Sequence, residues 1–456
     1  MNNKLANTVI FSGIVSFLVC LVSTNEKDYS FVFVLPLLLL LLSVVFYRAF
    51  DDLSNSMVFQ LIMLQSIFRY CLFPILLSLG QPLGNGEFSD YFNISITIMT
   101  IELVSAFYVL KIFSKKQKVA FLKKSSGITP LKGLLPLFVL LLFAFYYMYI
   151  SGALNKINPI WDFSTYLEDS LSGDIEQSSS TLALILFTPF KALSSLLFIT
   201  IIYKSKKIKI NYKKWLYLIV IFISSIFIVG TSRFSVILFV LPLLTLIKNI
   251  IHESDYKQIL GLTALLLVGV ITITSIQKFS RYGNEIASVD IVKASSLNAY
   301  FAGPGNIAIG LQAFEKVSYY DVPMYLINDT FQNIPLLSKL TKDEYKLNNK
   351  FNQEIYGHNL YADQIVPLSV SGLFHFGVLG VFFYSSVFIA IALYMERLSH
   401  VVKFIGYKYI LISLSIILSL VFMLNLGSLY AALARSFLFL FLPFLAISIF
   451  SKLKFR

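Results

Sequence analysis

Twelve long apolar runs divide this chain, and they constrain its fold more than any motif does. Hydrophobic residues make up 57% of the 456 residues and charged residues only 13%, a balance typical of polytopic membrane proteins and unsuited to a soluble domain. A helix of roughly 20 apolar residues crosses a bilayer core. Such runs lie near residues 5–23, 30–49, 56–80, 91–113, 133–150, 180–203, 215–230, 233–247, 258–276, 366–394, 409–426 and 434–451. The sequence therefore predicts an all-α polytopic membrane protein with about 12 transmembrane helices, in which runs seven and eight are either a tight pair or one broken helix.

The lysines predict the orientation of these helices. Two lysine clusters, 111–124 and 204–214, each lie between two apolar runs, as the positive-inside rule requires of cytoplasmic loops. Alternation from a cytoplasmic N terminus places the C terminus inside as well, whereas 18 of the 24 acidic residues fall in outer loops. The net charge of +13 is thus a feature of membrane topology, and no nucleic acid partner is expected.

One long segment, residues 277–365, separates the ninth predicted helix from the tenth. It falls on the outer side, and its many apolar and aromatic residues predict an ordered extracytoplasmic loop. Within it, Ile307, Leu311 and Phe314 would share one face of an amphipathic helix lying along the membrane surface. The chain is expected to divide into helices one to nine (1–276), the large loop (277–365) and helices ten to twelve (366–456).

Arginine is rare here, with seven residues against 30 lysines, so each position suggests that the planar guanidinium is needed. Arg233, Arg281 and Arg435 fall at the outer edge, where the positive-inside rule disfavours cations. Arg233 and Arg435 are each expected in the first turn of a helix, whose free N–H groups favour an anion. Together the three suit a pyrophosphate, although each could instead extend to lipid headgroups.

A second arginine, Arg69, lies in the middle of the third predicted helix. Glu102 lies at the same depth in the fourth helix, because each residue is 11 positions from the expected outer end of its helix. Charges inside a membrane are costly unless they are paired. We interpret the two as a structural ion pair that fixes helix packing.

The stretch "IYGHNLYAD", residues 355–363, holds one of the four histidines of the chain. His358 and Asp363 stand just before the tenth predicted helix, on the side of the three arginines, and either could accept a hydroxyl proton. Tyr361, Asn359 and, farther along the same side, Tyr282 are suited to stacking on or hydrogen bonding with a sugar. The alternative is an ordinary polar loop. Another histidine, His375, falls inside the tenth apolar run.

Other reaction classes lack their motifs. The sequence has no P-loop, GxGxxG, HExxH, CxxC pair or GxSxG motif, so neither a nucleotide, a metal nor another cofactor is expected. Cys20 and Cys71 lie inside apolar runs and are interpreted as core residues. The first run has no small-x-small cleavage site, which favours a membrane helix over a removed signal peptide.

The order of several short motifs resembles that of Wzy-type polymerases of O-antigen, capsule and related polysaccharides, most of all the enterobacterial common antigen branch. The motifs are "GTSR" (230–233), "RYG" (281–283), "PGNIAIGL" (304–311), "GHN...P" (357–367) and "ARSF" (434–437). The resemblance covers roughly residues 215–440. It does not extend to arginine-rich loops, since the long segment here holds a single arginine.

The resemblance implies a GT-C-like plan and a metal-independent glycosyltransferase of the cytoplasmic (inner) membrane. Such enzymes transfer a growing glycan en bloc from undecaprenyl pyrophosphate to a new lipid-linked repeat unit at the outer face. By this analogy His358, or alternatively Asp363, is the base, and Arg233, Arg281 and Arg435 hold the pyrophosphate. Expected partners are lipid-linked oligosaccharides, membrane lipids, and a chain-length regulator and flippase of the same pathway. An O-antigen ligase-like transferase and a flippase or transporter of lipid-linked sugars remain alternatives.

Overall fold

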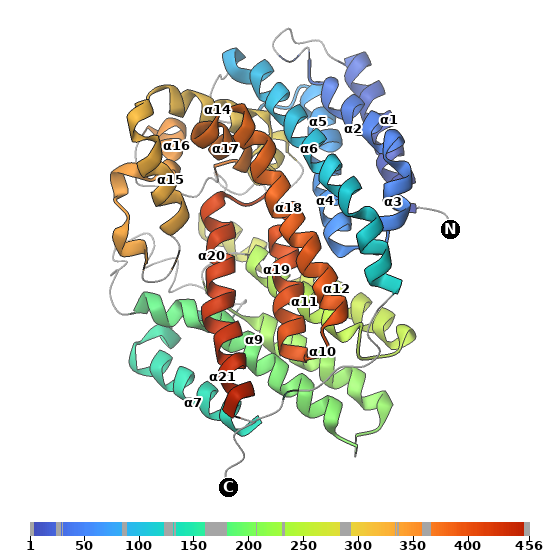
Figure 1. Cartoon of the computed structure of the whole chain (residues 1–456), viewed down its shortest axis with the longest axis vertical. Helices are drawn as coiled ribbons and strands as arrows, with labels where there is room; N and C mark the ends of the chain where they lie inside the picture. Colours follow the sequence, from blue (N-terminus) through green and yellow to red (C-terminus); the bar gives the residue numbers. More distant parts are fainter. Residues whose placement is uncertain are drawn as a thin grey trace. The chain divides into compact units, whose positions relative to one another are not determined.

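The chain is almost entirely helical in a computed structural model (Figure 1). The structure describes residues 4–23, 29, 31–83, 89–122, 131, 134–159, 180–206, 208–229, 233–282, 293–332, 334, 337–357 and 366–450. Within these residues, six helices are long and apolar enough to cross a membrane, or seven if one bent pair is a single span. Three further apolar helices are shorter. The chain is therefore a helical protein with the composition of a membrane protein, and the residues that the structure describes hold six or seven full-length spans where the sequence predicts twelve.

The helices belong to two compact units, each made of several chain segments. Unit 1 comprises Met1–Lys124, Asp290–Arg397 and Ser415–Ala434, and unit 2 comprises Ser125–Val289, Leu398–Leu414 and Arg435–Arg456. These units cut across the three consecutive segments expected from the sequence. The long segment expected at 277–365 lies mainly in unit 1, together with the first four predicted helices.

The helices within residues 4–122 form one part of unit 1. They are α1 (Lys4–Ser23), α2 (Val34–Val45), α3 (Tyr47–Leu53), α4 (Met57–Ile67), the π-helical turn η2 (Phe68–Leu72), α5 (Phe73–Ser78) and α6 (Ser89–Leu122). The axes of α2 and α3 differ by 74°, so the second predicted helix is bent. Gly13 of α1 lies against Leu40 of α2, where an added Cβ would approach the leucine Cβ to 3.1 Å. Close helix contact through small residues is common in membranes.

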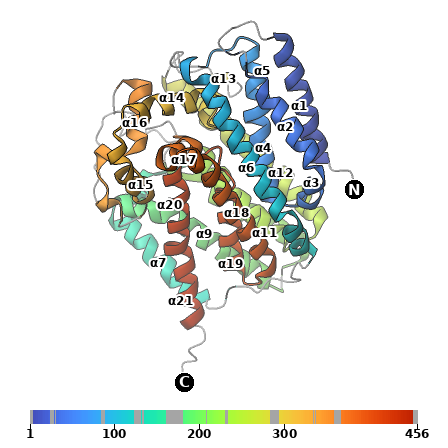
Figure 2. The same cartoon turned by 45° about the horizontal axis from the view of Figure 1, so that its top comes forward.

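Short helices form the other part of unit 1 (Figures 1 and 2). They are α13 (Ala294–Tyr300), α14 (Pro304–Glu315), η4 (Tyr319–Asp321), α15 (Val322–Phe331), η5 (Leu337–Leu340), η6 (Asp343–Tyr345), α16 (Leu347–Tyr356) and α17 (Leu368–Phe376). Helix α14 packs on α6, α16 and α17. Residues 304–310 are all buried, on every face of the helix. The prediction of a surface-lying amphipathic helix is wrong, because α14 is enclosed by its neighbours.

A glycine-rich break divides the tenth predicted helix into α17 and α18 (Val378–Val401). Gly377 between them has φ 63°, in the left-handed region that favours glycine. Gly372 and Gly380 then lie against each other, and a Cβ added to either would overlap the carbonyl of the other. Helix α17 is therefore folded back onto the start of α18. Its nine residues are too few to span a membrane.

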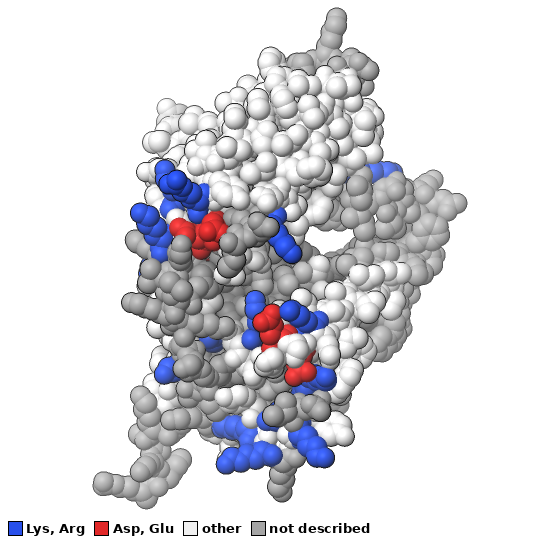
Figure 3. Space-filling model, turned by 90° about the vertical axis from the view of Figure 1, so that its right-hand side faces the viewer, with Lys and Arg blue, Asp and Glu red and all other residues white. Residues whose placement is uncertain are grey.

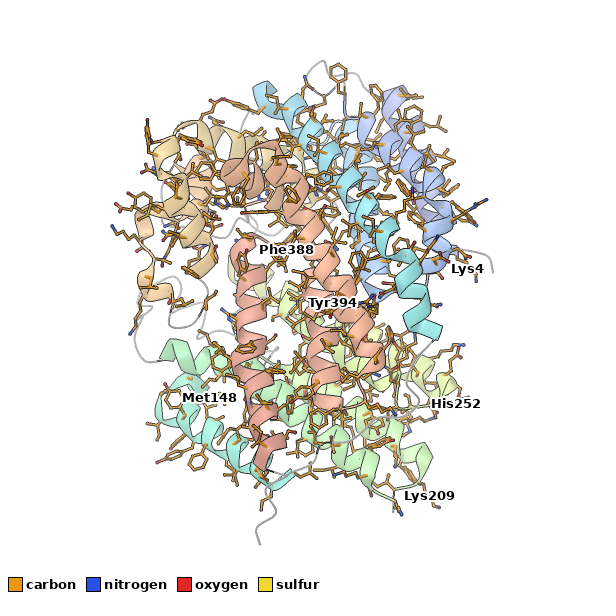
Figure 4. All side chains as sticks on the ribbon, in the orientation of Figure 1. Lys4, Met148, Lys209, His252, Phe388 and Tyr394 are labelled. Atoms are coloured by element: carbon orange, nitrogen blue, oxygen red, sulfur yellow. The ribbon has the colours of Figure 1, made fainter. Side chains whose placement is uncertain are left out.

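Unit 2 holds α7 (Leu134–Ile150), η3 (Ala153–Lys156), β1 (Ile157–Pro159), α9 (Ser180–Lys204), α10 (Ile210–Ile226), β2 (Phe227–Val229), α11 (Arg233–Ile247) and α12 (Glu253–Tyr282). Met148 of α7, labelled in Figure 4, shares a small buried cluster with Ala153 and Phe187. Strands β1 and β2 pair antiparallel, with Asn158 opposite Ile228. Strand β2 separates α10 from α11, so the seventh and eighth apolar runs are two helices.

Charged turns lie at one end of the hairpins in unit 2. Lys209 and His252 immediately precede α10 and α12 (Figure 4). Lys214 of α10 pairs with Asp255 of α12 at 3.3 Å, so the two helices begin at the same end of the unit. The seventh and ninth predicted helices therefore run in the same direction, as the alternating spans of the prediction require.

The last helices differ from the prediction. Helix α19 (Ile405–Leu418) is followed by non-helical residues, and α20 (Leu426–Ser436) continues through η7 (Phe437–Phe441) into α21 (Leu442–Phe450). The final span thus begins eight residues before the expected position 434. The reason is Asn425, whose side-chain oxygen accepts the Ser428 N–H at 2.8 Å and caps α20.

Gln65 of α4 satisfies the non-helical backbone between α19 and α20. Its side chain donates to the Ser419 carbonyl at 3.0 Å and accepts from the Phe422 N–H at 3.4 Å. Unwound backbone is tolerated at membrane depth when it is buried and hydrogen bonded. Gln65 of α4 thereby stabilises a break between α19 and α20 that the composition of the sequence does not reveal.

The described surface has wide uncharged areas. Figure 3 shows Lys, Arg, Asp and Glu gathered in a few groups, with a broad uncharged region in the upper part of the view. On α1, Phe11, Leu18 and Val22 are 67%, 54% and 84% exposed. Large exposed apolar side chains along a helix suit contact with lipid.

Candidate functional site

Most of the site residues expected from the sequence fall where no side chain is described. His358, Asn359, Tyr361 and Asp363 lie outside the described residues. Arg233 is the first residue of α11, and Arg281 and Tyr282 are the last two residues of α12. The side chains of these three are likewise not described, so the pyrophosphate and sugar assignments stay predictions.

The structure corrects the position of Arg435. The residue lies in the last turn of α20, ten residues into the final span, and its side chain is exposed. The expected first-turn position is wrong because Asn425 starts the helix earlier. A helix N terminus therefore cannot contribute to anion binding at Arg435. Arg233, by contrast, does begin its helix.

Arg69 and Glu102 form a buried ion pair in unit 1. Nη1 of Arg69 lies 2.7 Å from Oε2 of Glu102, with side chains 0% and 1% exposed. The Ser385 hydroxyl of α18 donates to the other carboxylate oxygen at 2.7 Å. The guanidinium also lies 4.7 Å from the ring centre of Phe422 and 5.5 Å from that of Tyr70. The pair joins η2, α6 and α18, as a structural role would require.

A second buried carboxylate, Glu396, joins three helices of unit 1. Its oxygens accept from the Met57 N–H at 2.5 Å, from the Ser56 hydroxyl, and from the Gln117 side chain at 2.7 Å. Met57 begins α4, so the carboxylate lies at a helix N terminus, which stabilises negative charge. We interpret Glu396 as a buried structural link between α18, α4 and α6.

Three titratable side chains from α15, α17 and α18 lie next to one another, with a hydrogen bond at one of the two contacts. Nε2 of His375 lies 3.6 Å from Oδ2 of Asp329, and its Nδ1 lies 2.9 Å from the Tyr384 hydroxyl. The His375 and Asp329 side chains are 0% and 5% exposed, whereas Tyr384 is half-buried. The fold-back at Gly377 brings the histidine to a tyrosine nine residues later. We call Asp329, His375 and Tyr384 the carboxyl–imidazole–phenol chain.

Neighbouring residues hold this chain in place. Phe374 packs against Phe314 of α14 and Tyr325 of α15, with ring centres 4.5 and 5.4 Å apart. Asn328, next to Asp329, bonds both backbone groups of Lys342, at 2.5 and 3.3 Å. Gln332 donates to the second oxygen of Asp329 at 3.3 Å. Helices α14, α15 and α17 thus fix the carboxyl and the imidazole from several sides.

Burial keeps both ends of the contact between Asp329 and His375 uncharged at neutral pH. Burial raises the pKa of Asp329 to about 8, against the opposing effect of the Leu347 N–H, which donates to the carboxylate. Burial also lowers the pKa of His375 to about 4. At neutral pH the carboxyl therefore holds its proton beside a neutral imidazole, and it loses that proton as the pH rises through about 8. Titratable pairs of this kind occur at sites of proton transfer.

Sequence reasoning missed this chain, although it noted that His375 lies in an apolar run. The available signal was a histidine flanked by Gly372, Gly377 and Gly380, which marks a break in a predicted span. Nothing in the sequence pairs it with Asp329. Among the described residues, no group of three or more His, Cys, Asp and Glu side chains could hold a metal ion.

Comparisons of this chain with protein-family models, with curated proteins and with solved structures give no match.

Proposed function

We propose that this chain is a polysaccharide polymerase of the cytoplasmic membrane. It transfers a growing glycan en bloc from undecaprenyl pyrophosphate to a new lipid-linked repeat unit at the outer face. The support from sequence is the ordered set of short motifs that resembles Wzy-type polymerases, together with the scarcity and placement of arginine.

The observation that carries the proposal is the layer of short helices in unit 1. Helices α13–α16 are seven to twelve residues long, too short to cross a membrane, and α14 packs on the long helix α6. The layer supplies Asp329 to the carboxyl–imidazole–phenol chain, whose other two members lie on α17 and α18. A folded layer beside membrane helices suits a substrate whose sugar is in water and whose lipid is in the bilayer. Buried titratable groups suit bond-making chemistry better than passive passage.

The reaction needs two kinds of group. A base accepts the proton of the acceptor hydroxyl while that oxygen attacks the anomeric carbon, and the bond from that carbon to the pyrophosphate oxygen breaks. Cations stabilise the charge that develops on the pyrophosphate. The proposal assigns the pyrophosphate to Arg233, Arg281 and Arg435. Sugar contacts go to Tyr282, Asn359 and Tyr361, and the resemblance assigns the base to His358 or Asp363.

A deletion strain analysed by polysaccharide gel tests this function. Loss of the long-chain ladder, with single lipid-linked units still made and exported, is the expected result. Units that accumulate on the inner face would indicate a flippase instead. Full-length polymer that is made but never joined to its final acceptor would indicate a ligase.

Substitutions in the same strain test the arginine assignment. Alanine at Arg233, Arg281 or Arg435 should abolish the ladder at normal protein level, and lysine should restore it poorly because bidentate contact is lost. Arg48→Ala is the matched control, since Arg48 lies at the predicted inner edge and should leave the ladder intact. A normal ladder from all three alanine variants would refute the assignment.

A further inference from the structure

Tyr384 is the most exposed member of the carboxyl–imidazole–phenol chain. The His375 and Asp329 side chains are buried, whereas Tyr384 is half-buried on α18. Tyr384 lies six residues into the span that begins at Val378, roughly 9 Å along the helix at 1.5 Å per residue. A group meeting the Tyr384 hydroxyl is therefore close to one end of a membrane helix, beside the short helices of unit 1.

We propose that Asp329, His375 and Tyr384 form a proton relay that accepts the hydroxyl proton of the acceptor sugar. This inference rests on the proposed function and adds the residues that remove the proton. Tyr384 is the one member that touches substrate, and His375 and Asp329 act through it. The relay takes the role of base in place of His358 or Asp363, and it uses only contacts between residues that the structure describes.

The step balances in protons and electrons. The acceptor hydroxyl gives its proton to the Tyr384 oxygen while the Tyr384 proton passes to Nδ1 of His375 and the Nε2 proton passes to Asp329. The acceptor oxygen forms a bond to the anomeric carbon, and the bond from that carbon to pyrophosphate breaks with its electron pair on the leaving oxygen. Pyrophosphate is a stable anion, so its departure needs no proton. The relay is thus required as a base.

The protonation state sets when the relay can act. With Asp329 protonated, the carboxyl proton points to Nε2 of His375. The single ring proton is then on Nδ1 and points to Tyr384, so Nδ1 cannot accept the Tyr384 proton. With Asp329 ionised, Nε2 carries the ring proton and Nδ1 accepts from the Tyr384 hydroxyl. The 3.6 Å separation between Asp329 and His375 is an open form of this contact, as catalytic hydrogen bonds often are without substrate.

Few other titratable groups face the relay from the elements that pack around it. Tyr325 of α15 lies against Phe374, and burial raises its pKa further from neutral. Tyr430 of α20 interacts electrostatically with Tyr384. Glu102 of α6 is held by Arg69 and Ser385. The Tyr325 phenol is therefore not expected to titrate between pH 7 and 9 in place of Asp329.

The pH dependence of polymerisation by the purified protein tests the relay. The rate should rise about tenfold from pH 7 to pH 9 and then level off, following ionisation of one group with a pKa of about 8. Asp329→Asn and Tyr384→Phe should lose this rise and be slow at every pH. Tyr325→Phe is the matched control, because the Tyr325 hydroxyl donates to the Glu344 carbonyl at 3.4 Å and has no part in the relay, so this variant should keep the wild-type profile. Wild-type profiles in the Asp329 and Tyr384 variants would overturn the proposal.

Infrared spectroscopy gives a readout independent of polymerisation. The carbonyl stretch of a protonated carboxyl group should disappear as wild-type protein is titrated from pH 7 to pH 9, and Asp329→Asn should lack that change. A wild-type spectrum without a titrating carboxyl in this window would overturn the relay even if polymer is made. Absence of polymer at all pH values, with the carboxyl titration present, would instead refute the proposed function.

Discussion

Replacing Asp329 by asparagine should make the protein more stable, and the gain should grow with pH. The folded carboxyl has a pKa of about 8, against about 3.9 in an unfolded chain. Between pH 4 and pH 8 the unfolded state has released this proton while the folded state still holds it. The free energy of unfolding of the wild type therefore falls as pH rises, by about 1.4 kcal/mol per pH unit from this group.

Asparagine is neutral at every pH and has nearly the same shape, so the variant escapes this cost. At pH 7 the difference extends over about three pH units, or about 4 kcal/mol in favour of the variant. The gain should be near zero at pH 4 and should reach its limit above pH 8. His375 titrates in both proteins, on the acid side of neutrality, and largely cancels from the difference.

Thermal unfolding in detergent, followed by circular dichroism at pH 5, 6, 7 and 8, measures this effect. The melting temperature of Asp329→Asn should exceed that of wild type by a margin that widens at each step. Asp343→Asn is the control, since Asp343 is exposed and Lys346 lowers its pKa, so its replacement should bring no gain. A margin that stays constant from pH 5 to pH 8 would refute a buried, protonated Asp329. A more stable but inactive variant is what a functional carboxyl predicts.

Two further substitutions test the packing around the site in the same assay. Arg69→Met should destabilise the protein by about 3–5 kcal/mol because Glu102 is left buried without its cation. The double variant, which adds Glu102→Gln, should recover much of that loss. A double variant no more stable than the single one would contradict the ion pair. Gly380→Ala should lower the free energy of unfolding by about 1–3 kcal/mol because the added Cβ meets the Gly372 carbonyl. Gly261→Ala in α12 is the control: an added Cβ there meets nothing within 4 Å, so the change should be neutral or stabilising. Equal effects of the two substitutions would rule out the tight α17–α18 contact.

The helical, apolar character of the chain was predictable because composition alone excludes a soluble domain. The contact between Arg69 and Glu102 also followed from the sequence, since the constant rise of a helix converts residue counting into depth. Both inferences depend on local or periodic properties. They need no knowledge of which helices pack together.

Breaks in helices were not predictable from hydropathy. Asn425 starts α20 within a region that is apolar on both sides, and Gly377 ends α17 inside a run that looks continuous. Each break is stabilised by distant residues, as when Gln65 satisfies the backbone of Ser419. The first break places Arg435 ten residues into the final span instead of in its first turn.

The candidate relay was also beyond the sequence. Asp329 precedes His375 by 46 residues, and they meet only because α15 packs on α17. Reasoning from the sequence favoured His358 and Asp363, which stand in a polar setting typical of sites. It passed over His375 because an apolar setting suggests a core residue. Burial is nevertheless what shifts the pKa values of the buried pair.

The most direct test of the account supplies purified protein in lipid nanodiscs with a polyprenyl-pyrophosphate-linked oligosaccharide of the host's own repeat unit. The account predicts products that grow in steps of one repeat unit, with one polyprenyl pyrophosphate released for each new linkage. It also predicts that no nucleotide sugar needs to be added. Lipid-linked units that remain single, in protein shown to be folded, would contradict the central claim.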